Sequence, residues 1–273
     1  MSDCSPNLVL GTAFGYDVKE VWSFVESLRR HYDGEVILLV SSRSSPGFID
    51  YLRGRNIQLV YFDCLYWMDT HFQVARYIRY GELLRGSRER YDRVLLTDVG
   101  DVFFQAHPFA DLPPGDLFFF LEDHHATITV CPSNSMWVQH VYGPEALLRL
   151  QSKRISCSGT TIGTHEAILG YIDKLLSHAK PALMSRLGRF SGHDQGIHNF
   201  LLHTGAFPGA TVFENGGHVY TLAQVPGQDI AVDARGISLA GSARLPAVIH
   251  QYNYHAATKT FVEAAFPLPP QPV

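Results

Sequence analysis

Several features that would assign this sequence to a class at once are scarce or missing. Only four cysteines occur in 273 residues, with no C-x-x-C pair, at positions Cys4, Cys64, Cys131 and Cys157. This argues against a cysteine-based zinc site and against an exported scaffold held by disulfides. No apolar run approaches the roughly 18 residues of a membrane-spanning helix. We therefore expect a cytoplasmic protein without a transmembrane segment.

A strong excess of charge of either sign is also absent. The chain has 22 Lys and Arg residues against 26 Asp and Glu residues, a formal net charge of -4. This balance excludes a broad basic surface, so nucleic acid is not an expected partner. Because the charges balance, any anion-binding site must be local.

The first residues, MSDCSPNLVLGTAFGYD, have a short apolar run with no positive charge before it, unlike a secretory signal.

What the sequence does contain is a regular alternation of apolar strands and amphipathic helices. Strand patterns occupy 8–13, 35–41, 57–62 and 93–97, and helix patterns lie between them near 18–28, 46–53 and 70–84. This alternation predicts an α/β protein with a mostly parallel sheet and flanking helices, in a single domain over residues 1–265. Further helices are predicted at 144–151, 164–177 and 195–203. The proline-rich end, 266–273, is predicted to be an extended or disordered tail.

Two carboxylates follow the predicted strand RVLLT at residues 93–97. Asp98 comes directly after this strand, and Asp101 follows three residues later. In parallel α/β sheets ligands bind beyond the carboxyl ends of the strands, so acidic groups there face a pocket. Carboxylate oxygens suit a hard divalent ion such as Mg²⁺ or Mn²⁺, which can bridge to a diphosphate. The simpler alternative is that Asp98 caps the next turn and Asp101 is solvated.

The helix predicted before this strand carries an arginine on its apolar face. With residues placed at helical spacing, Arg76 lies among Phe72, Tyr80 and Leu84, on the side that packs inward. A buried guanidinium needs an anionic partner. That partner is either a carboxylate such as Asp98 or a phosphate group, and the sequence leaves both open.

Two polar segments occur in the second half of the chain. The stretch SCSGT at 156–160 sets small hydroxyl side chains around a glycine, where backbone approaches a polar ligand closely, or it forms a turn with side-chain caps. Asp194 and Gln195 stand before an apolar helical run, where the alternative role of Asp194 is to cap the helix. The Gln195 amide both donates and accepts hydrogen bonds, as recognition of a hydroxyl-rich ligand requires.

Taken together, these segments resemble glycosyltransferases of the GT-A fold, most closely the branch that contains glycosyltransferase families 8 and 77. The resemblance rests on Arg76-Tyr77 in a helix, LLTDVGDVFFQAHPF at 95–109, CSGTTIG at 157–163 and HDQGIHNFLL at 193–202. It runs from about Leu8 to His255, with these islands as its distinctive parts. It implies a GT-A-type, Rossmann-like sheet and transfer of a sugar from a nucleotide-diphosphate sugar.

The resemblance also implies a metal centre. Arg76, Asp98 and Asp101 take the places of the helix arginine and the D-x-D motif that hold the metal and the nucleotide diphosphate. The spacing here is D-x-x-D, one residue longer than in the family. A C-terminal histidine completes the metal site, and His250 matches that position best, ahead of His255. The expected ion is Mn²⁺ or Mg²⁺.

The donor sugar and its nucleotide have expected contacts as well. Ser158, Gly159 and Thr160 match the segment that lines the sugar pocket, with Ser158 where an asparagine is more usual. The end of the first strand is where such enzymes cradle the base and ribose. Its residues are Gly11, Thr12 and Ala13.

The expected reaction follows from the same family pattern. Asp194 and Gln195 match its D-Q-x-x-x-N element and are the expected catalytic residues, as sugar-positioning or oxocarbenium-facing groups. The resemblance implies a UDP-sugar donor, retention of anomeric configuration, and a glycan, lipid-linked glycan or other hydroxyl acceptor, as in polysaccharide biosynthesis. The sequence does not identify the sugar.

Two functions of other classes remain as alternatives. A metal-dependent phosphohydrolase can also use D-x-x-D after a strand, but the D-x-D-x-T nucleophile loop of haloacid dehalogenases is not present, because Gly100 and Val102 occupy its place. A non-catalytic nucleotide-sugar binding protein would keep Arg76 without needing metal ligands. The product, free phosphate or nucleoside diphosphate, separates a hydrolase from a transferase, and nucleotide binding without turnover would indicate the binding protein.

Overall fold

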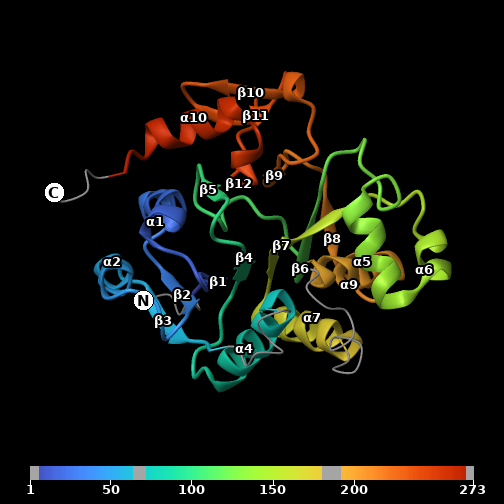
Figure 1. Cartoon of the computed structure of the whole chain (residues 1–273), viewed down its shortest axis with the longest axis horizontal. Helices are drawn as coiled ribbons and strands as arrows, with labels where there is room; N and C mark the ends of the chain where they lie inside the picture. The colour runs from blue at the N-terminus through green and yellow to red at the C-terminus, as the bar shows by residue number, and fades with distance from the viewer. Residues whose placement is uncertain (1–5, 64–71, 180–191, 269–273) are drawn as a thin grey trace.

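The computed structural model describes residues 6–63, 72–179 and 192–268 (Figure 1). At its centre lies a seven-stranded sheet in the order β3-β2-β1-β4-β7-β6-β8. Its strands are β1 (Leu8–Thr12), β2 (Glu35–Val40), β3 (Gln58–Tyr61), β4 (Val94–Thr97), β6 (Leu117–Leu121), β7 (Ser156–Gly163) and β8 (Thr211–Phe213). Four of the six neighbouring pairs are parallel, and the two pairs that β7 makes are antiparallel. The predicted α/β class with a mostly parallel sheet is therefore confirmed.

Helices cover both faces of this sheet. The helices of the described residues are α1 (Val18–His31), α2 (Pro46–Gly54), α4 (Phe72–Gly86), α5 (Pro132–Tyr142), α6 (Pro144–Arg149), α7 (His165–His178), α9 (His193–His203) and α10 (Ala256–Ala265). α1 and α2 pack on one face, and α4, α7 and α9 pack on the other, each group over its own apolar core (Figure 1). Strands covered on both faces are mostly apolar, as β1 (LVLGT), β2 (EVILLV) and β4 (VLLT) are. Within the described ranges, none of these helices is long and apolar enough to span a membrane.

The sequence explains where two helices begin. Asp17 is the N-cap of α1 and accepts hydrogen bonds from the first turn, while the Glu20 carboxylate accepts one from the Asp17 backbone N–H at 2.9 Å. This capping box satisfies donors that a helix start leaves unpaired. The N-cap of α9 is Gly192, at φ 91°, so Asp194 lies inside the first turn. The capping alternative for Asp194 is therefore wrong, and α9 begins two residues before Gln195, its predicted start.

A smaller sheet brings the C-terminal part of the chain back to the centre. It consists of β5 (Val102–Phe104), β12 (Val248–His250) and β9 (Val219–Thr221), with β12 in the middle. In this register His250 pairs with Val102, the residue after Asp101. A separate hairpin is formed by β10 (Ile230–Asp233) and β11 (Gly236–Leu239). The pairing of β5 with β12 sets a histidine beside the D-x-x-D segment.

The last described residues pack against the body of the protein. The Phe266 ring is buried and lies edge-on to Phe103, with ring centres 5.6 Å apart. The Arg30 guanidinium lies 4.1 Å from the centre of the Phe266 ring. Packed structure thus continues past residue 265, after which the proline-rich tail was predicted, and residues 269–273 of that segment lie outside the described residues.

Candidate functional site

A cleft of about 500 Å³ lies at the carboxyl ends of β1 and β4. Its walls come from several segments that are distant in sequence: the end of β1, α4, the turn after β4, β7, the start of α9 and the segment after β12. Seven predicted site residues line it, namely Thr12, Arg76, Asp98, Asp101, Ser158, Asp194 and Gln195. Ligand sites of α/β sheets occur beyond the carboxyl ends of the strands. We therefore take this cleft as the candidate site.

The turn that follows β4 holds two carboxylates at the cleft. The backbone N–H of Asp98 donates to the Gly159 carbonyl at 2.8 Å, and the carbonyl of Asp101 accepts from the Gln251 N–H at 2.8 Å. Both ends of the turn are thus fixed to neighbouring strands or their extensions. Gly100, between them, packs so closely on Tyr16 that a Cβ atom there would lie 2.8 Å from the Tyr16 hydroxyl oxygen. The four-residue turn D-x-x-D therefore presents both carboxylates to the cleft.

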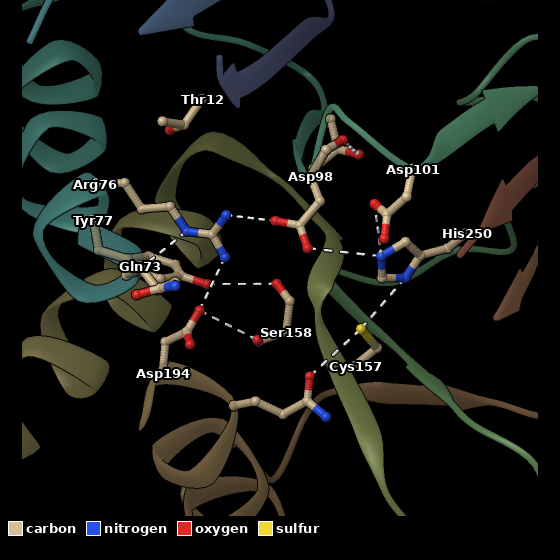
Figure 2. Close-up of polar contacts among 12 residues, drawn as sticks. Thr12, Gln73, Arg76, Tyr77, Asp98, Asp101, Cys157, Ser158, Asp194 and His250 are labelled. Carbon is tan, nitrogen blue, oxygen red and sulfur yellow. Dashed lines mark hydrogen bonds and ion pairs between the residues drawn. The ribbon is translucent and has the colours of Figure 1, made fainter. Parts of the chain in front are cut away.

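His250 faces both of these carboxylates (Figure 2). Its Nε2 atom lies 3.6 Å from Asp98 Oδ2 and 3.5 Å from Asp101 Oδ1. This nitrogen is buried and has no hydrogen-bond partner among the described residues. The three side chains offer ligand atoms that all lie within 4.8 Å of one another. The three residues predicted to bind metal are thus brought together, although their sequence positions are far apart.

Arg76 connects the two sides of the cleft (Figure 2). Its Nη1 donates to Asp98 Oδ1 at 2.5 Å, its Nη2 donates to Asp194 Oδ2 at 2.9 Å, and its Nε donates to the Gln73 carbonyl at 3.1 Å. The sequence left either a carboxylate or a phosphate group as the partner of Arg76. In the structure the buried guanidinium contacts two carboxylates. A guanidinium carries five N–H donors, and these contacts use three of them. Arg76 retains hydrogen-bonding capacity toward a ligand in the cleft.

Nearby charge and burial act in opposite directions on the pKa values of Asp98 and Asp194, the two carboxylates that Arg76 contacts. Burial raises the pKa of Asp98, but Arg76 and His250 outweigh it and hold that pKa well below its usual range. At Asp194 burial is the larger effect, so its pKa is raised in spite of the Arg76 charge. Asp194 also accepts a hydrogen bond from the Ser158 hydroxyl at 3.4 Å. The cleft thus holds a firmly ionised carboxylate on one side of Arg76 and a less readily ionised one on the other.

A chain of polar side chains extends from Gln195, on the cleft wall, into the interior. The Cys157 sulfur lies 3.4 Å from His250 Nδ1 and 3.6 Å from Gln195 Oε1. The Gln195 amide in turn donates to Glu122 Oε1 and to Asn134 Oδ1, both at 3.2 Å. Burial raises the pKa of Glu122 to about 7. His250 and Gln195 are therefore linked through the Cys157 thiol.

Two glycines allow these side chains to meet. A Cβ atom on Gly159 would lie 2.3 Å from Asp98 Oδ2 and 2.9 Å from the His250 ring, so any other residue would displace the cluster. A Cβ atom on Gly192 would lie 2.2 Å from the Trp137 ring, where α5 packs against the start of α9. The absence of a side chain at Gly159 therefore leaves room for Asp98 and His250 beside the β7 backbone.

The other predicted residues lie beside the cleft, not on its wall. Gly11 is buried in β1, where a Cβ atom would meet Val99 at 2.7 Å, and Ala13 is fully buried. The Thr12 hydroxyl, which does line the cleft, is 2.6 Å from the Tyr80 hydroxyl. Thr160 is buried within β7, opposite Thr97.

Two further residues from the sequence patterns have contacts outside the cleft. The Asn199 amide holds the backbone of Ser156 through a pair of hydrogen bonds at 2.8 and 2.9 Å. His255, the second choice for a metal ligand, is within hydrogen-bond distance of the Leu222 carbonyl, 2.9 Å from His255 Nε2. The SCSGT segment is strand β7 and not a turn.

Several residues at the cleft were not predicted as site residues. They are Tyr16, Gln73, Trp137, Gln251 and Asn253 on its wall, and Glu122, Asn134 and Cys157 behind it. Glu122 follows the apolar strand β6 directly, just as Asp98 follows β4, so the same pattern at a strand end would have found it. Cys157 had no such signal, because its contact with His250 depends on how β7 and β12 are placed in space.

The sequence comparisons add no family to this geometry. No protein-family model matches the chain, and a search of curated proteins finds no match.

Proposed function

We propose that this protein is a glycosyltransferase of the GT-A fold, which transfers a sugar from a nucleotide-diphosphate donor to a hydroxyl acceptor. The observation that carries the proposal is the convergence of Arg76, Asp98, Asp101 and His250 with Asp194 and Gln195 around one cleft. Within the described residues this arrangement joins a candidate cation site to a polar pocket able to recognise hydroxyl groups. The resemblance to families 8 and 77 adds a UDP-sugar donor and retention of configuration.

The residues present fit a hard divalent ion. Two carboxylates and one imidazole face one point, and the buried Nε2 of His250 is aimed at both carboxylates without a hydrogen-bond partner in the described chain. An oxygen-rich donor set with one histidine suits Mn²⁺ or Mg²⁺. When bound, such an ion neutralises negative charge on the leaving diphosphate. Asp98, Asp101 and His250 would hold it.

Arg76 sets the geometry between the leaving group and the sugar. By pairing with both Asp98 and Asp194, its planar fork fixes the separation of the two carboxylates. Its remaining N–H donors are available to the diphosphate, where fixed positive charge stabilises the developing negative charge. Lysine would supply the charge but not this two-sided grip.

Asp194 and Gln195 form the sugar side of the proposed site. Asp194 is held by Arg76 and Ser158, and the Gln195 amide is oriented by Cys157, Glu122 and Asn134. Groups whose positions are fixed in this way can discriminate between hydroxyl arrangements, because a wrong partner leaves a buried polar group unpaired. In this proposal they position the sugar and face its positive charge as the bond to the phosphate breaks.

Thermal shift of the full chain against nucleoside diphosphates and nucleotide sugars, each with and without Mn²⁺, tests the proposal. A ligand at 100 times its dissociation constant stabilises the fold by about 2.7 kcal/mol. We expect stabilisation by one nucleotide that is larger with Mn²⁺, followed by release of nucleoside diphosphate when an acceptor is added. Free phosphate as the product would indicate the phosphohydrolase instead. Binding without turnover, across acceptors, would indicate the non-catalytic binding protein.

A further inference from the structure

A second group of metal-binding side chains lies outside the cleft, directly after β6. Asp123, His124 and His125 follow one another in sequence, and their ligand atoms all lie within 4.8 Å of one another. His124 Nδ1 is 3.8 Å from Asp123 Oδ2, and the two imidazole rings lie side by side with centres 3.8 Å apart. We call these three residues the β6-loop cluster.

The carboxylate of this cluster is held in place before any ligand binds. The Asp123 side chain is only 8% exposed, and its Oδ1 accepts a hydrogen bond from the His125 backbone N–H at 2.8 Å. The His124 side chain, by contrast, is 65% exposed. A buried carboxylate is costly unless a positive charge or a metal ion accompanies it. The exposed histidine side chains can rotate to complete a site around the fixed carboxylate.

The surroundings of the cluster also favour a cation. The three residues line a cavity of about 560 Å³ together with Glu214, Asp229, Asn215, Tyr220 and Arg154. Arg154 is paired with Glu214, which offsets its charge. Asp123 and Asp229 remain as acidic groups of the same cavity. Two imidazoles and a carboxylate are therefore presented in a locally acidic pocket.

We propose that the β6-loop cluster is a second metal site, selective for a divalent transition ion of the Zn²⁺ type. Imidazole nitrogens suit Zn²⁺, Ni²⁺ or Cu²⁺, whereas Mg²⁺ and Mn²⁺ prefer sites richer in oxygen. The ion would fasten the segment that begins one residue after Glu122, whose carboxylate contacts Gln195. This site does not depend on the glycosyltransferase proposal, since no residue of the cleft belongs to it.

Isothermal titration of the metal-free full chain with Zn²⁺, in excess Mg²⁺, tests this site. We expect one Zn²⁺ per chain in an Asp98→Asn/Asp101→Asn variant, because the cleft can no longer compete. Adding His124→Ala and His125→Ala to that variant should weaken this binding at least tenfold. His31→Ala, which removes a half-buried histidine of α1 outside both clusters, is the matched control and should change nothing.

The loop variants should fold, because the histidine side chains are exposed, and their melting temperature without metal checks this. Asp123→Asn is a second, nearly isosteric variant that removes the charge and should weaken Zn²⁺ binding as well. Equal Zn²⁺ affinity with and without His124 and His125 would overturn the proposal. So would the absence of Zn²⁺ binding in the Asp98→Asn/Asp101→Asn variant. If Zn²⁺ binds as expected while no nucleotide binds, the second site stands and the proposed function fails.

Discussion

The two acid and histidine clusters found among the described residues are built in opposite ways. In the cleft, His250 is 1% exposed while Asp98 and Asp101 are 34% and 27% exposed. In the β6-loop cluster, the carboxylate is buried and His124 is exposed. The cleft cluster is assembled from β12 and the turn after β4, whereas the loop cluster comes from three consecutive residues. The fold therefore holds the first cluster in place, and rotation of exposed side chains completes the second.

The largest expected effect would separate the two clusters. Asp98→Asn keeps the size of the side chain but removes the charge that holds a hard divalent ion. We expect transfer to fall at least about 1000-fold, or ~4.1 kcal/mol, with Zn²⁺ binding at the β6-loop cluster unchanged. Asp101→Asn should lose as much or less. Activity assays at limiting Mn²⁺ measure this loss. Near-normal turnover of Asp98→Asn would contradict the proposal that the cleft binds a metal ion.

Glu122 and Asp123 are adjacent in sequence but belong to different sites. The contribution of Glu122 to the free energy of unfolding depends on pH. Its pKa is raised by burial from 4.5 to about 7, so the fold favours the protonated form. The stability this gives is complete below pH 4.5 and is lost as pH rises through 7. Glu122→Gln keeps a neutral side chain at every pH. We therefore expect the variant to exceed wild type in free energy of unfolding by on the order of 3 kcal/mol at pH 8, and by little at pH 4.5.

Urea unfolding at both pH values measures this difference. Subtracting wild type from variant cancels the titration of all other groups that the substitution leaves unaltered. The same difference at pH 4.5 and pH 8 would show that the Glu122 carboxyl does not have a raised pKa.

The sugar side of the cleft should respond differently from its metal side. Gln195→Ala removes an amide that Cys157, Glu122 and Asn134 orient, and we expect turnover to fall at least ~100-fold, about 2.7 kcal/mol. Affinity for UDP should stay nearly unchanged, because this residue is proposed to face the sugar. Asp194→Ser should lower turnover similarly. This substitution also removes one of the two carboxylate partners of Arg76, so the melting temperature of the variant is the control for a loss of stability. Turnover of Gln195→Ala above a tenth of wild type would contradict the role.

The smallest expected effect concerns the support behind His250, a feature of the cleft cluster. With Nε2 facing the metal, His250 Nδ1 would donate to the Cys157 sulfur, which orients the ring. Cys157→Val replaces the thiol by a somewhat larger apolar side chain and removes the acceptor, so we expect Mn²⁺ affinity to fall about tenfold, or ~1.4 kcal/mol. Cys157→Ser, which retains an acceptor, should restore part of it. Titration of Mn²⁺ followed by electron paramagnetic resonance measures the affinity without any assay of activity. Equal affinities in wild type and Cys157→Val would make Cys157 a packing residue only.

The sequence predicted best those features that depend on local pattern. Strands β1, β2 and β4 are mostly apolar runs, and Asp98 was recognisable because it follows β4 directly. Arg76 was recognisable from its place on the apolar face of α4. Helix α5 was not predicted, because its sequence has little apolar periodicity: the residues that it buries are Asn134 and Val138.

Features that depend on contact between distant segments could not be predicted from pattern. The reversal of β7 between β4 and β6 sets Gly159 against Asp98, and the pairing of β5 with β12 sets His250 against Asp101. The capping role considered for Asp194 was plausible from sequence, since an acidic residue there stands before a helix. The structure instead directs its side chain across the cleft to Arg76.

The central claim is that the cleft binds a nucleoside diphosphate together with a divalent ion held by Asp98, Asp101 and His250. Isothermal titration with UDP, in the presence and absence of Mn²⁺, tests this most directly when wild type is compared with Asp98→Asn. We expect Mn²⁺ to strengthen UDP binding at least tenfold in wild type, about 1.4 kcal/mol, and to have no such effect in the variant. UDP affinity that is unchanged by Mn²⁺ in wild type, or strengthened equally in Asp98→Asn, would contradict the claim.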